Sequence, residues 1–147
     1  MKGYISNLEK DTLENTDYRR VVYTAKNSQL VLMSIAPGDE IGAEVHSLDQ
    51  FLRIEGGVGK AVVGDAEYDV KDGSAIVIPA GINHNVINTG DVDLKLYSIY
   101  SPPEHKDGTI HKTKADEVEE HFDGQTTEWF NTQGYEIYPK RKSIIER

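Results

Sequence analysis

The chain has 147 residues, contains no cysteine, and carries 16 basic against 25 acidic side chains, for a formal net charge of −9. This charge repels nucleic acid and anionic membrane surfaces, so neither is an expected partner. Without cysteine there is no disulfide and no thiolate metal site. The length fits one domain, 1–147. Because no apolar stretch reaches signal-peptide or membrane-span length, we expect a cytoplasmic protein.

Short apolar runs alternate with turns between residues 20 and 100. The runs are rich in β-branched and aromatic residues, and turn signals recur about every 8–12 residues, as in antiparallel sandwiches and barrels. No regular alternation of strands with helices is present, so a parallel sheet is not expected. The predicted strands are residues 20–24, 29–35, 41–46, 50–54, 60–63, 68–70, 74–78, 84–87 and 94–100.

The two ends of the chain differ from this middle part. Residues 1–19 form a polar N-terminal arm, in which 7–13 fits either a short helix or an ordered extended segment. Residues 104–112 are expected to be a polar loop, followed by a short helix over 113–122 with Thr113 as N-cap and Gly124 as its end. The remaining tail contains aromatic residues, which we expect to pack on the barrel or on a partner subunit.

The stretch from Gly38 to Gly57 places a carboxylate, an imidazole and an amide at Glu44, His46 and Gln50. Side chains two residues apart on a strand point to the same face, so Glu44 and His46 are predicted to face the same way. Gln50 has the same parity and joins them if the chain bends at 47–49. These residue types can ligate a metal ion, so the stretch supplies half of a metal site.

A second stretch, residues 73–88, reads G-x5-P-x-G-x2-H-x3-N. Its first glycine turns the chain, and Pro79 with Gly81 shapes a tight reversal at the end of a strand. His84 opens the returning strand, where it can face the barrel interior. In that orientation it stands opposite Glu44 and His46, and it would complete the site.

Both stretches resemble the two motifs of a small single-domain cupin. The second motif matches at every defining position. The first motif, G-x5-H-x-H-x3-E-x6-G, keeps its spacing, but Glu44 replaces the first histidine and Gln50 replaces the glutamate. The chain is also similar to a subgroup with an E-x-H…D-Q first motif, often labelled as like mannose-6-phosphate isomerase. That label is a fold analogy and carries little functional weight.

The resemblance covers about residues 29–100. It implies an all-β fold, a double-stranded β-helix or jelly-roll cupin barrel, here with a short C-terminal helix and tail. It further implies a homodimer and a divalent metal ion, Fe, Mn, Zn or Ni, in the barrel mouth. The implied metal ligands are Glu44, His46, Gln50 and His84.

Two imidazoles and one carboxylate suit Fe(II) and similar ions that keep open positions. Gln50 is a weaker ligand, which either binds the ion or hydrogen-bonds a bound water or substrate. We therefore expect a metal-dependent enzyme acting on a small oxygen-rich molecule, a sugar or a keto or hydroxy acid, with isomerase, epimerase or lyase chemistry. The alternatives are an Fe(II)-dependent dioxygenase and a non-catalytic binding or sensing module, and a polar mouth without metal is the simplest competing interpretation.

Further polar and aromatic residues lie close to the motifs in sequence. His105 and His111 are expected to be solvated loop residues, with an acid–base role at the mouth as the alternative. Tyr97 and Tyr100 fall on opposite faces of the last predicted strand, so one of them is expected to face the interior, as part of the core rather than as a catalytic group.

Overall fold

The computed structural model describes residues 2–117; Met1 and residues 118–147 lie outside the described part. The predicted helix residues beyond 117, its expected end at Gly124 and the aromatic tail therefore fall outside the described residues. The elements are α1 (Leu8–Glu14), β1 (Arg19–Thr24), β2 (Gln29–Ile35), β3 (Asp49–Gly56), β4 (Val58–Val63), β5 (Ala66–Lys71), β6 (Ala75–Ile78), β7 (His84–Asn88), β8 (Leu94–Ser101) and β9 (Ile110–His111).

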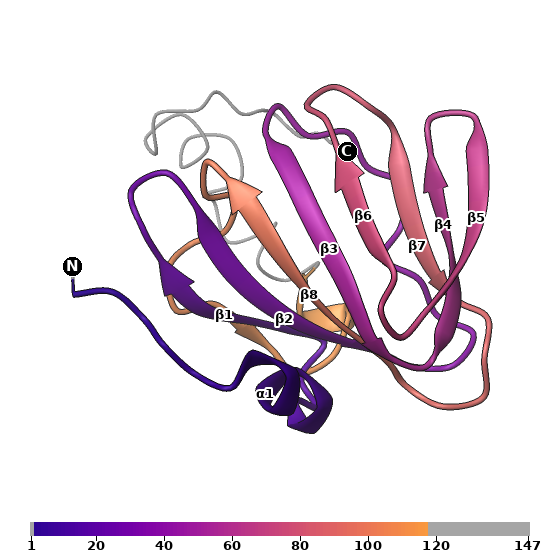
Figure 1. Ribbon diagram of the computed structural model, residues 1–147, viewed down its shortest axis with the longest axis horizontal. Coiled ribbons are helices and arrows are strands. Elements are labelled where there is room, and N and C mark those ends of the chain that lie inside the picture. The colour runs from indigo at the N-terminus through magenta and orange to yellow at the C-terminus, as the bar shows by residue number, and fades with distance from the viewer. Residues whose placement is uncertain (1, 118–147) are drawn as a thin grey trace.

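The strands form two antiparallel sheets (Figure 1). One has six strands in the order β6-β3-β8-β2-β1-β9, and the other has three in the order β5-β4-β7. Strands that follow one another in sequence are often not neighbours, as in the jelly-roll arrangement. The predicted all-β antiparallel barrel is confirmed.

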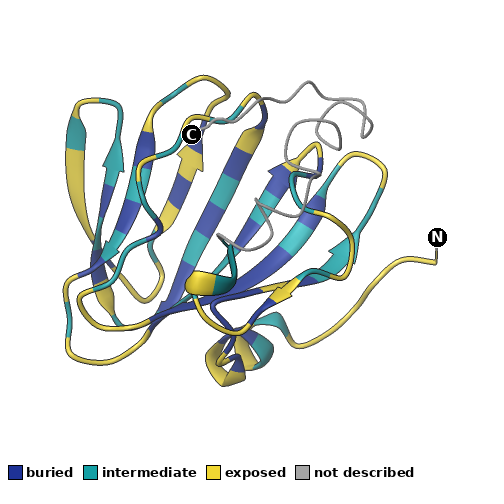
Figure 2. Cartoon of the chain, turned by 180° about the vertical axis from the view of Figure 1, so that it is seen from behind, coloured by how far each residue is buried: buried dark blue, intermediate teal, exposed yellow. Residues whose placement is uncertain are grey.

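Inward-facing side chains of the larger sheet are apolar at one end and polar at the other. Buried and half-buried residues alternate along β8, and Leu94, Leu96 and Tyr100 are among the buried ones (Figure 2). The register places Gln29 opposite Tyr100, and Tyr100 opposite Gln50, across β2, β8 and β3. The apolar end stabilises the fold, because each fully buried Leu or Ile contributes about 1.5–3 kcal/mol. The polar end is where the site lies.

The prediction of a strand over residues 41–46 is wrong, because this segment is not part of either sheet. Residues of this segment make only isolated bridges to β7, and one of them joins Glu44 and His84. The physical reason is Gly42, whose φ of +106° takes the chain out of the extended conformation. The segment is nevertheless fixed, because the N–H groups of Glu44 and His84 each donate to the other residue's carbonyl at 2.9 Å.

Both ends of the described chain contain regular structure outside the main strands. Residues 8–14 are the helix α1, with the Asn7 side chain accepting a hydrogen bond from the Lys10 N–H. The predicted loop 104–112 contains β9, which pairs with the start of β1. A helix starts at residue 115, and Asp116 accepts a hydrogen bond from the Thr113 N–H at 3.2 Å, as in a capping box. In the described part of the chain, no helix is long and apolar enough to cross a membrane.

Candidate metal centre

Glu44, His46 and His84 come together at the polar end of the barrel. Each offers one ligand atom, and these three atoms lie within 4.8 Å of one another. Nε2 of His46 is 3.0 Å from Oε1 of Glu44, and Nε2 of His84 is 3.6 Å from the same oxygen. The two imidazole rings have centroids 5.0 Å apart. One carboxylate oxygen and two imidazole nitrogens therefore face a common point.

The tautomer of His84 is fixed by its own neighbourhood. Its Nδ1 lies 2.9 Å from the carbonyl oxygen of Ile82, which only accepts hydrogen bonds, so Nδ1 carries the proton. In the neutral ring, Nε2 is then the nitrogen without a proton. It is buried and has no hydrogen-bond partner within residues 2–117. A buried lone pair without a donor fits a metal ion, and a histidine ligand whose other nitrogen donates to a carbonyl is the usual arrangement.

The charge of Glu44 also fits a cation. Burial of this carboxyl group opposes its ionisation, but the charge and hydrogen bond of His46 outweigh that effect, and the neighbouring His84 adds a smaller contribution. The pKa of Glu44 is therefore held well below its usual range, and the side chain is a carboxylate at neutral pH. An ion entering the group would take over the Nε2 nitrogen that His46 now directs at Glu44, with release of any proton held there.

Gln50 lies on β3, opposite Tyr100 of β8, and is only 3% exposed. Its Nε2 donates to the Ser98 hydroxyl at 3.3 Å, whereas Oε1 is buried without a partner within the described residues. Tyr100 connects Gln50 to the histidines, because it faces Gln50 across the sheet and its ring contacts His46 with centroids 5.9 Å apart. The amide oxygen is thus a buried acceptor, and Tyr100 is the residue that connects this part of β3 to His46.

The sequence analysis missed Glu104 as part of this neighbourhood. Its Oε2 lies 3.7 Å from Nδ1 of His46, so both nitrogens of that ring face carboxylates. A carboxylate behind a histidine ligand orients the ring and makes it a stronger ligand. No sequence signal distinguished Glu104 from other acidic loop residues, since its position depends on where the chain turns after Pro103.

The expectation that His105 and His111 are solvated is wrong. His105 packs edge-on against Tyr100, with centroids 5.2 Å apart, and its Nε2 is buried without a partner in the described part. Burial, followed by the charge of Arg19, lowers the pKa of His105 well below its ordinary value, so the ring is neutral. His111 is 5% exposed and lies 3.2 Å from Nη1 of Arg19. Both histidines turn inward because the chain returns to pair β9 with β1.

The two tyrosines of β8 lie on opposite faces of the strand, as their positions in the sequence predict. Tyr100 is buried and faces the metal centre, while Tyr97 is half-buried on the other face against Phe51, at 6.3 Å between centroids. Tyr100 therefore packs in the hydrophobic core, as expected, and its ring also contacts His46 of the site.

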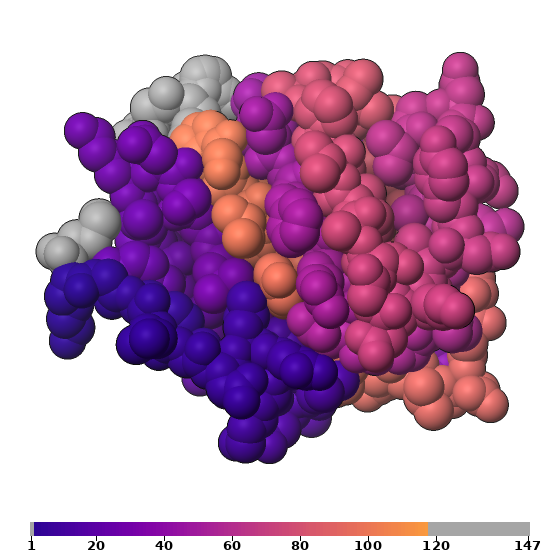
Figure 3. Space-filling model, viewed as in Figure 1, coloured from indigo at the N-terminus to yellow at the C-terminus, as the bar shows by residue number. Residues whose placement is uncertain are grey.

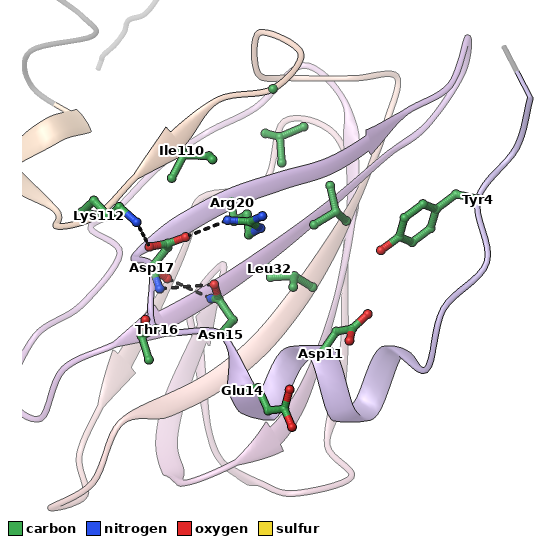
Figure 4. A pocket seen from close by; sticks show the side chains of 13 residues that line it. Tyr4, Asp11, Glu14, Asn15, Thr16, Asp17, Arg20, Leu32, Ile110 and Lys112 are labelled. Atoms are coloured by element: carbon green, nitrogen blue, oxygen red, sulfur yellow. Dashed lines mark hydrogen bonds and ion pairs between the residues drawn. The ribbon is translucent and has the colours of Figure 1, made fainter.

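A hollow also lies elsewhere on the molecule, between α1, β1 and β9. This cavity has a volume of about 720 Å³ and includes none of the candidate ligands. Its central carboxylate, Asp17, is already paired with Arg20 at 3.2 Å and Lys112 at 3.3 Å (Figure 4). Asp17 thus already has cationic partners, and the lining of the cavity includes no histidine.

Residues 31–100 match the sequence model of a known family, described as Cupin domain. The chain therefore contains a cupin domain. The fold agrees with this assignment, and the predicted resemblance to a cupin is confirmed at this level. The group of Glu44, His46 and His84 lies where the resemblance implied the metal ligands of the cupin barrel.

Two known proteins are similar to this chain in sequence, and one solved structure is similar in both sequence and fold. The chain is 48% identical over 124 residues to the uncharacterized protein YrkC of Bacillus subtilis (strain 168), covering 80% of this chain and 67% of YrkC. It is 46% identical over 112 residues to the uncharacterized protein L612 of Acanthamoeba polyphaga mimivirus, covering 73% of this chain and 70% of L612. The crystal structure of BH2720 from Bacillus halodurans superposes with a TM-score of 0.79 at 46% identity, covering 80% of this chain and 95% of BH2720. These names state no activity, so the function is argued from the site.

Proposed function

We propose that this cupin is a metal-dependent enzyme that acts on a small oxygen-rich substrate, a sugar or a keto or hydroxy acid. Glu44, His46 and His84 would hold a divalent ion, with Gln50 as a fourth ligand or as an acceptor for a bound water or substrate. The observation that carries the proposal is the convergence of three ligand atoms within 4.8 Å, one of them a buried nitrogen without a partner.

The ion would supply Lewis-acid polarisation of a substrate carbonyl or hydroxyl oxygen. The chain itself supplies the surroundings. Tyr100 and Gln50 close the inner side of the site, and both are at most 3% exposed, which limits water there. His105 stays neutral because its pKa is lowered, so it is available to accept or donate a proton at Nε2. These features support isomerase, epimerase or lyase chemistry.

The second candidate is an Fe(II)-dependent dioxygenase. It is favoured by one observation, the two-histidine, one-carboxylate composition of the group, which suits non-haem Fe(II) with open positions. Oxygen consumption over a panel of sugars and organic acids separates the two candidates. Uptake that requires both iron and a substrate supports the dioxygenase, whereas turnover of the same substrate without oxygen supports the isomerase or lyase.

Metal content tests the common part of both candidates. Elemental analysis of the purified protein is expected to find about one divalent ion per chain in the wild type and less than about a tenth of that in His84→Ala or Glu44→Gln. Glu67→Gln is the matched control, because Glu67 lies on the β5 surface and pairs only with Lys60 among the described residues. A protein that takes up no ion, yet still binds a sugar or acid, would support the non-catalytic binding module.

We also propose that the protein forms a homodimer through its N-terminal arm, residues 2–7. This segment precedes α1 (Figure 1) and is held against β1 by a hydrogen bond from the Gly3 N–H to the Tyr23 hydroxyl at 2.8 Å; together with α1 it makes up the indigo lower left of Figure 3. Ile5 is 95% exposed, and Tyr4 is 45% exposed although its ring stacks on Tyr23. Light scattering is expected to give twice the chain mass of 16.4 kDa, and Ile5→Asp is expected to give the monomer. Val77→Asp, at another exposed apolar residue, is the control.

We further propose that the chain belongs to the cupin subgroup with the E-x-H…D-Q first motif. The support is that Glu44 lies with the histidines and that Gln50 has a buried amide oxygen without a partner in the described part of the chain.

A further inference from the structure

Several buried polar atoms near Tyr100 have no hydrogen-bond partner within the described residues. Apart from the atoms already described around the metal centre and those of the Arg53–Glu55 ion pair, they are Oη of Tyr18, Nε of Arg19 and Nε2 of His105. Leaving a buried polar group unpaired costs free energy, so most buried polar groups in proteins are paired. Three such atoms from two separate segments of the chain indicate a place built for a ligand.

Arg19 is the charged member of this set. It is the first residue of β1, it is 1% exposed, and its guanidinium lies 5.2 Å from the centroid of the Tyr18 ring. Nη1 contacts Oε2 of Glu117 at 2.8 Å and Nδ1 of His111 at 3.2 Å. The guanidinium is a planar fork of five N–H donors, so these contacts leave the buried Nε–H for a second acceptor.

Tyr18 adds a second donor beside Arg19. Burial, followed by the carboxylate of Glu117, raises the pKa of Tyr18 well above its usual value, so its hydroxyl keeps the proton. The residue is 4% exposed. A neutral buried hydroxyl without a partner can donate a hydrogen bond, as can the Arg19 Nε–H. Both donors would therefore be satisfied by a group that accepts hydrogen bonds.

His105 links these donors to the metal centre. The Gln29 side chain holds its backbone: Nε2 donates to the His105 carbonyl at 2.7 Å, and Oε1 accepts from the N–H of Glu104 at 3.1 Å and of His105 at 2.9 Å. Gln29 is itself 1% exposed. The ring of Tyr100 contacts both His105 and His46, at 5.2 Å and 5.9 Å between centroids. The positive charge of Arg19 also contributes to lowering the pKa of His105, so the guanidinium and this ring lie within electrostatic range of each other.

We propose that Tyr18, Arg19 and His105 form a carboxylate-binding subsite beside the metal centre, so that the substrate is a hydroxy or keto acid rather than a neutral sugar. This inference rests on the proposed function. Arginine and tyrosine present donors, which suit an anionic acceptor and fit the mixed donors and acceptors of a sugar less well. A phosphate would add two negative charges to an interior that already holds Glu44, Glu104 and Glu117. A carboxylate adds one.

Calorimetric titration tests the subsite, with glycolate and L-lactate as acids and ethylene glycol and propane-1,2-diol as their neutral counterparts. Each is titrated into metal-free and Mn(II)-loaded protein. The acids are expected to bind at least about tenfold more tightly than the diols to the loaded protein. Arg19→Gln is expected to remove this preference for acids without weakening diol binding. Tyr18→Phe and His105→Gln are each expected to remove part of the preference. Arg20→Gln, on the neighbouring outward-facing residue, is the control.

The metal-free titration separates this inference from the proposed function. If the protein binds no metal but binds the acids in an Arg19-dependent way, the metal-dependent function is wrong and the subsite stands. If metal binds and the acids and diols bind equally, or if folded Arg19→Gln binds acids unchanged, the subsite is wrong and the function stands. Should Arg19→Gln fail to fold, unchanged acid affinity in both Tyr18→Phe and His105→Gln overturns the inference. Failure of both acids to bind either form overturns it as well.

Discussion

Nε2 of His84 lies 3.6 Å from Oε1 of Glu44, too far for a hydrogen bond and close to the separation of two ligands on one cation. Metal–nitrogen and metal–oxygen bonds of about 2.1 Å, at angles between octahedral and tetrahedral, put two ligand atoms about 3.0–3.4 Å apart. A shift of a few tenths of an ångström would therefore bring both atoms to bonding distance. Because Ile82 already fixes the His84 tautomer, this nitrogen needs no proton rearrangement to bind an ion.

Gln50 provides a test of how close its amide oxygen is to the ion. Gln50→Glu is expected to raise metal affinity by about tenfold, because it places a negative charge where a neutral acceptor now stands. The same change is expected to lower the melting temperature of the metal-free protein, since it buries an uncompensated charge. Calorimetry and thermal melts measure the two effects. Unchanged affinity would mean that residue 50 does not face the ion.

Glu104 is expected to strengthen His46 as a ligand. Glu104→Gln should weaken metal binding by about tenfold while leaving one ion per chain, because it removes the carboxylate 3.7 Å from Nδ1 without removing a ligand. Competition with a chelator of known affinity measures the change. Glu67→Gln serves again as the surface control, and equal affinities for the two variants would rule out a role for Glu104.

Gln29 is expected to be a large contributor to stability. Gln29→Met keeps the approximate size of the side chain but leaves the N–H groups of Glu104 and His105 without their acceptor. We expect a loss of about 2–4 kcal/mol in the free energy of unfolding, measured by urea denaturation. The exposed residue Asn83, changed to Ala, provides the comparison. A loss below that of the control would show that the loop is held by other contacts.

The buried neutral ring of His105 makes stability depend on pH. Its pKa in the folded protein is lowered well below the ordinary value of 6.5, so the unfolded chain takes up a proton first as the pH falls. The free energy of unfolding should therefore decrease below about pH 6.5 and continue to decrease toward the lowered pKa. Between pH 6.5 and 5.5, the decrease in the free energy of unfolding is expected to be about 1 kcal/mol smaller in His105→Gln than in the wild type. Parallel slopes for wild type and variant in urea titrations would contradict the assignment.

The strands and the placement of His84 could be predicted from the sequence because both depend on local patterns. Alternation of apolar residues sets which face of a strand is buried, and Pro79 with Gly81 sets where β7 begins. The prediction for Glu44 and His46 was only partly local. Their side chains do meet, 3.0 Å apart, but the segment is not a strand, and the backbone pairing of Glu44 with His84 holds it in place.

The second half of the site could not be predicted, because it depends on long-range pairing. Charged side chains are rarely buried unless they are paired, and the partners of Arg19 are far away in sequence, with His111 92 residues later. Nothing local shows that β9 returns to β1 or that Gln29 holds Glu104 and His105. These contacts hold the polar loop against the barrel, so that its side chains line the interior.

The location of the ion is the most direct test of the account. Crystals grown with Mn(II) or Zn(II), measured at the absorption edge of the metal, are expected to show one anomalous peak within about 2.0–2.3 Å of Glu44 Oε1, His46 Nε2 and His84 Nε2. A peak bound by other residues, or none from protein that carries a stoichiometric amount of metal in solution, would contradict the metal centre on which the proposed function depends.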